Sequence, residues 1–141
     1  MAAMKVYLSY HIKDRLSAAG VRRGLESAGI DVLDPVERAN PGDNLFDVAA
    51  RALEHAQAMV LLISPDQVES PWFQHEWEYA ITQPRFEGRV VPVFARPTKD
   101  LPWILGKLEP LDLKGGAVRV GRKAADRIKL PLAERRRRLG S

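Results

Sequence analysis

The chain lacks cysteine altogether, which excludes disulfides, thiolate metal ligands and a cysteine nucleophile from its 141 residues. It has no apolar run near the ~20 residues that a membrane-spanning helix needs, and residues 1–8 lack the basic and long apolar segments of a secretory signal. Its three histidines, His11, His55 and His75, do not have the spacing of metal ligands. We therefore expect one domain of ordinary size, without a metal, in the cytoplasm.

The glycine-rich motifs that bind nucleotide phosphates are also missing. No Gly-x-Gly-x-x-Gly follows the first predicted strand and no Walker A motif occurs, so neither a Rossmann dinucleotide site nor a P-loop is expected. A phosphoacceptor receiver carries an acidic residue at the end of its third strand, where this chain has Ser64. A functional site must therefore be built from other residue types.

Basic charge is concentrated at the end of the chain. The net charge is +4, but residues 119–141 contain nine of the 22 basic residues and two of the 18 acidic ones, which leaves −3 on the preceding part. A nucleic-acid-binding domain spreads its basic residues over a folded face, so we expect neither nucleic acid nor a membrane as partner. We predict a core over 1–118, and a last helix with a basic tail over 119–141. The arginines at 135–138 are expected in a solvated tail or in a linker to a further domain.

Hydrophobic patterning predicts strands that alternate with helices. Short apolar runs predict strands and apolar residues at helical spacing predict helices; the strands are expected at 5–10, 30–33, 58–63, 89–94 and 109–113, and the helices at 14–28, 45–56, 70–83 and 117–130. Pro and Gly residues predict a long loop over 34–44. Pro92 predicts that the fourth strand lies near a sheet edge or a strand end, and Ser70 before Pro71 predicts a helix N-cap. This order indicates an α/β fold, a flavodoxin-like three-layer sandwich with a central parallel sheet of about five strands and helices on both faces.

Trp72 and Glu76 are the pair of residues that points most clearly to chemistry. Ligands of parallel α/β sheets bind beyond the carboxyl ends of the strands, and these two residues begin the helix that follows the third strand. At positions i and i+4 they share one helix face. An indole offers a flat surface to a heteroaromatic ring, and a carboxylate stabilises positive charge or binds ribose hydroxyls. The same spacing also fits a core tryptophan beside a solvated or ion-paired glutamate, so spacing alone does not decide.

Several motifs in order resemble those of a Toll/interleukin receptor (TIR) domain, from about residue 5 to residue 113. The motifs are Val-Tyr-Leu-Ser-Tyr at 6–10, Val-Leu-Asp at 32–34 through Asn-Pro-Gly-Asp at 40–43, Leu-Leu-Ile-Ser at 61–64, Ser-x-Trp-x-x-x-Glu at 70–76 and Val-Pro-Val-Phe at 91–94. Each motif alone is weak, but their order and spacing together are fairly specific to the family.

The resemblance implies a catalytic role for Glu76. Some TIR domains cleave NAD⁺ at the nicotinamide–ribose bond and release nicotinamide with ADP-ribose or a cyclic isomer, and these enzymes carry a glutamate four residues after a tryptophan, as here. NAD⁺ is then the substrate, and no cofactor is implied. The residues implied to line the substrate site are Ser9, Tyr10, His11 and Trp72. His11 and Ile12 stand where several NAD⁺-cleaving members have basic residues, which leaves Lys13 or Arg15 to hold the pyrophosphate. Phe73 stands where the family commonly has cysteine.

The resemblance also implies activation by self-assembly. In the family, the loop after the second strand contacts neighbouring TIR domains and the active site is completed between subunits. The residues of this loop that we expect to take part are Asp34, Arg38, Pro41, Gly42 and Asp43. The implied setting is immune or defence signalling or virulence in a microbe, with a sensor or effector domain or protein as a further partner.

Two other functions fit the same residues. The first is a TIR scaffold or adaptor that acts through TIR–TIR contacts without catalysis. The second is a nucleoside deoxyribosyltransferase-like enzyme. The segment Glu76-x-x-Tyr79-Ala80 of this chain resembles the glutamate pattern of that enzyme group. The sequence leaves all three functions open.

Overall fold

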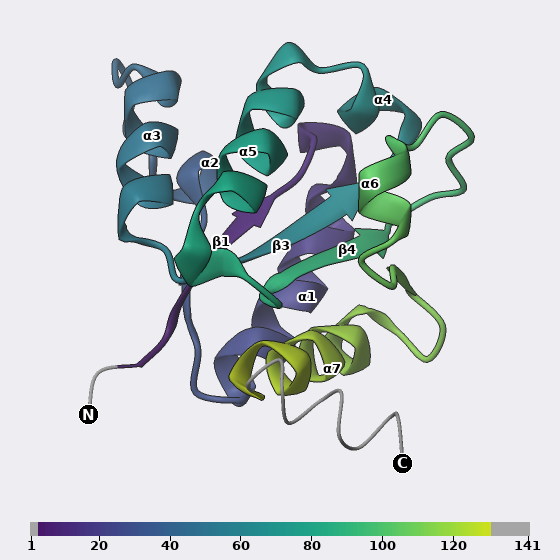
Figure 1. Cartoon of the computed structure of the whole chain (residues 1–141). Helices are drawn as coiled ribbons and strands as arrows, with labels where there is room; N and C mark the ends of the chain where they lie inside the picture. The colour runs from purple at the N-terminus through teal and green to yellow at the C-terminus, as the bar shows by residue number, and fades with distance from the viewer. Residues whose placement is uncertain (1–2, 131–141) are drawn as a thin grey trace.

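The computed structural model describes residues 3–130 and contains one parallel sheet. Its five strands lie in the order β2-β1-β3-β4-β5 (Figure 1), and they are β1 (Lys5–Ser9), β2 (Asp31–Leu33), β3 (Ala58–Ile63), β4 (Val90–Phe94) and β5 (Leu111–Asp112). This is the flavodoxin-like strand order. The predicted α/β class and the predicted five-stranded parallel sheet are confirmed.

Helices cover both faces of the sheet. One face is covered by α1 (Arg15–Ser27) and α7 (Ala117–Lys129), and the other by α3 (Leu45–His55) and α5 (Pro71–Thr82) (Figure 1). Shorter helical turns connect these elements: η1 (Ile12–Asp14), α2 (Pro35–Arg38), α4 (Pro65–Val68), η2 (Pro84–Phe86) and α6 (Trp103–Gly106). No helix among residues 3–130 is both long and apolar enough to cross a bilayer.

The central strand β3 supplies side chains to both halves of the core. All six of its residues are buried. Val60 and Leu62 pack toward α1 and α7, whereas Met59, Leu61 and Ile63 pack toward α3 and α5. The period of two in a strand produces this division, and a strand buried on both faces reads as a continuous apolar run.

The last helix belongs to the folded core, so the predicted boundary at 118 is wrong. Helix α7 buries five residues against α1 and the sheet: Val120, Gly121, Ala124, Ala125 and Ile128. Gly24 of α1 lets the two helices approach closely, since a Cβ at this position would lie 2.1 Å from the carbonyl oxygen of Val118. The helix predicted over 117–130 is therefore present as α7 and belongs to the core, and the arginine run at 135–138 lies outside the described residues.

Two short helices were not predicted: α2 lies in the segment predicted as loop, and α4 lies in a segment for which no element was predicted. In each, a polar residue precedes proline, and its side chain caps the first turn. Asp34 accepts a hydrogen bond from the backbone N–H of Glu37 and starts α2. Ser64 accepts one from the backbone N–H of Gln67 and starts α4.

Two local predictions about proline-containing segments agree with the structure. The fourth strand, which contains Pro92, lies next to the edge strand β5, so it is near the edge of the sheet as predicted. The short β5 pairs only with Val93 and Phe94, which leaves Pro92 unpaired on that side and explains why its missing N–H is tolerated. Ser70 does precede the first residue of α5, but its side chain makes no capping hydrogen bond.

Candidate functional site

Glu76 lies inside the molecule, where strand β1 supplies hydrogen-bond donors to both of its carboxylate oxygens. Glu76 is 4% exposed to solvent. The Ser9 hydroxyl donates to Oε1 over 2.7 Å, and the Tyr7 hydroxyl donates to Oε2. Tyr7 and Ser9 are two residues apart on one strand, so their side chains point to the same face of the sheet. The predicted pairing of Glu76 with Ser9 at one site is found in the structure, and Tyr7 is an additional member that sequence reasoning missed.

A buried glutamine fixes the direction of the Ser9 hydroxyl. Gln67 of α4 is 4% exposed, and its side-chain amide donates to the Ser9 oxygen over 2.8 Å. A serine hydroxyl has one proton. Because the Ser9 oxygen accepts from Gln67, its own proton is directed to Glu76.

Burial dominates the electrostatics of Glu76. Loss of solvent raises its pKa to about 7, although its interactions with Tyr7, Ser9 and Trp72 act in the opposite direction. Burial and the neighbouring carboxylate raise the pKa of Tyr7 far above its usual range. The Tyr7 hydroxyl therefore stays protonated, and Glu76 titrates close to neutral pH.

Trp72 is half-buried beside Glu76 and belongs to an aromatic cluster. Its ring packs edge-on against Phe46 at 5.2 Å between centroids and lies 5.9 Å from the ring of His75. Phe46, the second residue of α3, is 62% exposed. Trp72 packs against the core on one side, in agreement with the interpretation of this residue as part of the core; its role in substrate binding stays a prediction. Phe46 was not predicted as part of the site, although it is the nearest aromatic residue after the Pro-Gly turn.

Tyr10 is not brought to Glu76. Adjacent residues of a strand point to opposite faces, and Tyr10 packs into the core formed by α1 and α7. Its hydroxyl donates to the two carboxylate oxygens of Asp34 over 3.0 and 3.1 Å. Asp34 is 3% exposed, pairs with Arg22 at 3.2 Å, and has a pKa raised by burial. Tyr10 and Asp34 are bonded to each other within the fold, so the structure brings Tyr10 neither to Glu76 nor to Ser9, and it places Asp34 below the exposed surface of the loop.

The other predicted assembly residues are all exposed, and Arg38 among them is also held by hydrogen bonds. Arg38 is tied to the edge strand, since its guanidinium donates to Asp31 over 3.2 Å and to the carbonyl oxygen of Val32 over 3.0 Å. Pro41, Gly42 and Asp43 are exposed in the turn that follows. Gly42 has φ +89°, a left-handed conformation that favours glycine. Residues 41–43 and the exposed side chain of Arg38 are thus within reach of another molecule.

His11 precedes η1 as its N-cap and Lys13 lies within η1, next to an ionic cluster at the carboxyl ends of the strands. The ring Nδ1 of His11 accepts from the backbone N–H of Lys13 over 3.2 Å, which caps η1. The Lys13 ammonium pairs with Asp66 at 3.3 Å, and Arg15 is exposed at the start of α1. His11 therefore makes a local turn contact, and the charge of Lys13 is already paired.

Arg96 holds the centre of this ionic cluster. Its guanidinium donates to Asp14 over 2.8 Å and to Asp66 over 2.7 Å. These bonds raise the pKa of Arg96 and lower that of Asp66. Arg96 and Asp14 are 82 residues apart in the sequence, so no local pattern could have predicted their contact.

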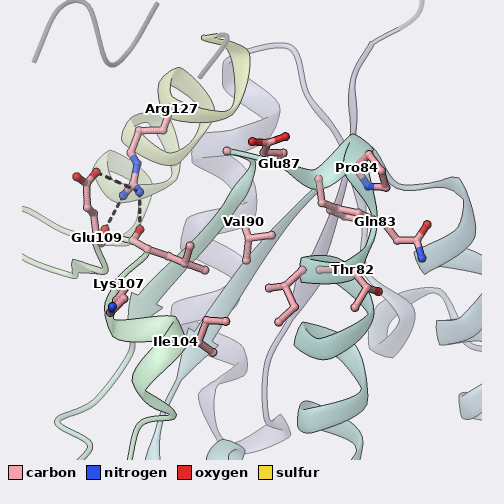
Figure 2. Close-up of a pocket in the computed structure, with 14 residues that line it drawn as sticks. Thr82, Gln83, Pro84, Glu87, Val90, Ile104, Lys107, Glu109 and Arg127 are labelled. Atoms are coloured by element: carbon pink, nitrogen blue, oxygen red, sulfur yellow. Dashed lines mark hydrogen bonds and ion pairs between the residues drawn. The ribbon is translucent and has the colours of Figure 1, made fainter. Parts of the chain in front are cut away.

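A pocket of about 670 Å³ lies away from Glu76, at the other end of α5. Figure 2 shows it between the end of α5, helix α6 and the last turns of α7. Val90, the first residue of β4, lines it together with Ile104, so it is at the amino ends of the strands. Arg127 closes one side, where its guanidinium donates to the carbonyl oxygens of Leu108 and Glu109 over 2.7 Å each. No residue that lines this pocket contacts Glu76, Tyr7 or Ser9 through a hydrogen bond among the described residues.

Comparisons with known proteins agree with the fold. Residues 6–128 match the TIR domain family. The TIR domain of the Toll-related receptor TRR-2 from Hydra magnipapillata is 21% identical over 76% of this chain and 82% of that one, with a TM-score of 0.64. A metazoan TIR-STING receptor from C. gigas, in complex with 2′,3′-cGAMP, is 26% identical over 90% of this chain and 40% of that one, with a TM-score of 0.71. The TIR domains of the activated Roq1 resistosome, which directly recognises the pathogen effector XopQ, are 18% identical over 97% of this chain and 77% of that one, with a TM-score of 0.54.

No curated protein sequence matches the chain. The family match nevertheless spans nearly all of the described residues, and the solved TIR domains share the strand-and-helix arrangement of Figure 1. On these grounds the chain belongs to the TIR domain family.

Proposed function

We propose that this TIR domain cleaves NAD⁺ at the nicotinamide–ribose bond, with Glu76 as the catalytic carboxylate. The observation that supports this proposal most is that Glu76 is a buried carboxylate whose two oxygens accept hydrogen bonds from donors of one strand. A helix surface glutamate needs no such partners. The half-buried Trp72 and exposed Phe46 beside it supply aromatic faces for the rings of a nucleotide.

The chemistry proposed for this site is electrostatic. When the bond between nicotinamide and ribose breaks, its electron pair goes to the nicotinamide nitrogen and neutralises the pyridinium ring. Positive charge then develops on the anomeric carbon and the ring oxygen of the ribose. The ionised Glu76 carboxylate stabilises this charge and accepts hydrogen bonds from ribose hydroxyls. Water then adds to the anomeric carbon and releases a proton, which gives ADP-ribose.

Cyclisation follows the same first step. If water is excluded, a nucleophile within the ADP-ribose part attacks the anomeric carbon and a cyclic isomer forms. A covalent ester between Glu76 and the ribose is an alternative intermediate on either route. In each case NAD⁺ is the substrate, and its two products besides the proton are nicotinamide and an ADP-ribose form.

We propose that assembly opens and completes this site. Glu76 is 4% exposed in the single chain, so a ribose reaches its carboxylate only after a covering segment moves. The exposed turn at 41–43 precedes Phe46, which contacts Trp72. A neighbouring TIR domain that binds this turn would shift the aromatic cover beside Glu76. The resistosome in which the Roq1 TIR domains occur is an assembled, pathogen-recognising complex, and we propose an analogous defence role in the cytoplasm.

A scaffold without catalysis is the second candidate function. The enclosure of Glu76 in the hydrogen bonds of Tyr7 and Ser9 favours it, because the same network would serve as a structural link between β1 and α5. Incubation with NAD⁺ and, separately, with deoxynucleosides, followed by chromatography, distinguishes the candidates. NAD⁺ consumption with nicotinamide release supports our proposal. Base exchange between deoxynucleosides identifies a deoxyribosyltransferase, and no turnover of either at high protein concentration favours the scaffold.

A further inference from the structure

Tyr7 is a polar residue in a position that packing alone would fill with an apolar one. It is 1% exposed, and its ring lies in the core formed with α3 and α5. Its hydroxyl donates to the Oε2 oxygen of Glu76, and the indole of Trp72, which can only donate, also interacts with the Tyr7 oxygen. Phenylalanine has the same ring and would fill the same space, so packing does not require the hydroxyl.

We propose that Tyr7 is a positioning residue that holds the Glu76 carboxylate in its reactive orientation and favours its ionised form. The inference rests on the proposed function of Glu76 in NAD⁺ cleavage. According to this proposal, the hydroxyl of Tyr7 extends the active pH range of the site to lower pH.

The backbone of β1 makes Tyr7 a rigid donor. Tyr7 is paired on both sides in the sheet, with Leu33 of β2 and with Met59 of β3. Its ring is enclosed in the core, so the hydroxyl is held at one place. Ser9, two residues further on, directs a second donor to the other oxygen of Glu76. The two bonds together fix the plane of the carboxylate.

The chemistry of the pair favours the ionised carboxylate. Burial keeps the proton on Tyr7, so its hydroxyl acts as a donor, and a donor binds a carboxylate better than a carboxylic acid. The other groups that act on the Glu76 carboxyl are the Ser9 hydroxyl of β1 and the Trp72 indole of α5. Gln67 of α4 acts through Ser9. No cation of residues 3–130 is among these groups, so the compensation for burial comes from neutral donors.

A charge at the end of the neighbouring strand also acts on Tyr7. The field of Asp34 raises the pKa of the Tyr7 hydroxyl further. This effect strengthens the retention of the proton on Tyr7 and does not reverse the direction of the hydrogen bond. Asp34 itself is held by Tyr10 and Arg22, and no hydrogen bond among the described residues joins it to Glu76.

The test compares the pH dependence of NAD⁺ cleavage in wild-type protein and in Tyr7→Phe, both under conditions of full assembly. The matched control is Tyr79→Phe, which removes a hydroxyl from α5 that accepts a hydrogen bond from Arg85 over 2.9 Å and does not contact Glu76. We expect the acid limb of the kcat profile of Tyr7→Phe to move up by about one pH unit, which lowers turnover below the limb by about tenfold. Above the limb, activity should approach that of wild type, and KM should change little.

A direct titration separates this inference from the proposed function. The side-chain carboxyl carbons of ¹³C-labelled glutamate are followed by NMR as a function of pH, and the Glu76→Gln variant assigns the signal of Glu76. We expect Glu76 to titrate at about pH 7 in wild type and at a higher pH in Tyr7→Phe. This readout does not depend on any turnover of NAD⁺. If the wild-type protein never consumes NAD⁺, the proposed function is wrong. The effect of Tyr7 on Glu76 is then judged from the titration of Glu76 alone.

The inference is overturned if Tyr7→Phe and wild type share one pH profile and one Glu76 titration. It is also overturned if Tyr79→Phe moves the acid limb as far as Tyr7→Phe does. Should Tyr7→Phe fail to fold, site-specific Tyr7→3-fluorotyrosine retains the hydroxyl and makes it a stronger donor. The acid limb and the titration of Glu76 should then both move to lower pH, and no movement would contradict the role of Tyr7.

Discussion

The burial of Glu76 makes the stability of the fold depend on pH, and Glu76→Gln removes that dependence. The ordinary pKa of this carboxyl is 4.5, and burial raises it to about 7 in the folded state. The folded protein therefore binds this proton more tightly than the unfolded chain does. The stabilisation is complete below about pH 4.5 and is lost as the pH rises through about 7. The difference of about 2.5 pH units corresponds to about 3 kcal/mol.

Urea unfolding of wild type and of Glu76→Gln, followed by tryptophan fluorescence at pH 4.5 and at pH 8, measures this effect. Other carboxyls also titrate in this range, among them Asp34, whose pKa is raised by burial. Their contributions cancel when the two proteins are compared at each pH. We expect the stability of Glu76→Gln relative to wild type to increase by about 3 kcal/mol between the two pH values. A constant difference between the proteins would refute the argument that Glu76 is buried with a raised pKa.

Three further predictions concern the core and the predicted loop. Gly24→Ala should destabilise the fold by about 1–3 kcal/mol or more in urea unfolding, because its Cβ would overlap α7; Gly106→Ala, where a Cβ meets no atom within 4 Å, is the control and should have little effect. Tyr10→Phe should leave NAD⁺ turnover near the wild-type rate while it costs about 1–3 kcal/mol of stability through the lost bond to buried Asp34, and a loss of turnover without loss of stability would return Tyr10 to the substrate site. Turnover per molecule should rise with protein concentration in a dilution series, and Asp43→Lys in the exposed turn should weaken that rise; a flat series would show that one chain contains the complete site.

Patterns of local origin were predicted well from the sequence. The apolar run at 58–63 predicted a central strand buried on both faces, and β3 has that burial. The helix after it carries Trp72 and Glu76 on one face, as the i, i+4 spacing requires. The period of two along β1 also determines which of its side chains share a face of the sheet. It places Ser9 with Tyr7 and Tyr10 on the opposite face.

Features that depend on tertiary contacts could not be predicted in the same way. Nothing near Gly24 in the sequence indicates that α7 will lie against it. The bridge from Arg96 to Asp14 and Asp66 joins segments that only the sheet order brings together. The boundary at 118 follows from the charges of α7, which suggest a solvated helix, whereas its small apolar residues are buried against α1 and the sheet.

The central claim is that Glu76 catalyses the cleavage of NAD⁺. Its most direct measurement is NAD⁺ consumption and nicotinamide release by wild type and by Glu76→Gln at high, matched protein concentration, with circular dichroism to compare the folds. Loss of a positioned catalytic carboxylate typically lowers the rate by ~10²–10⁴-fold. We expect a loss of this size in a variant that remains folded. Full activity of folded Glu76→Gln, or no nicotinamide release by concentrated wild type, would contradict the account.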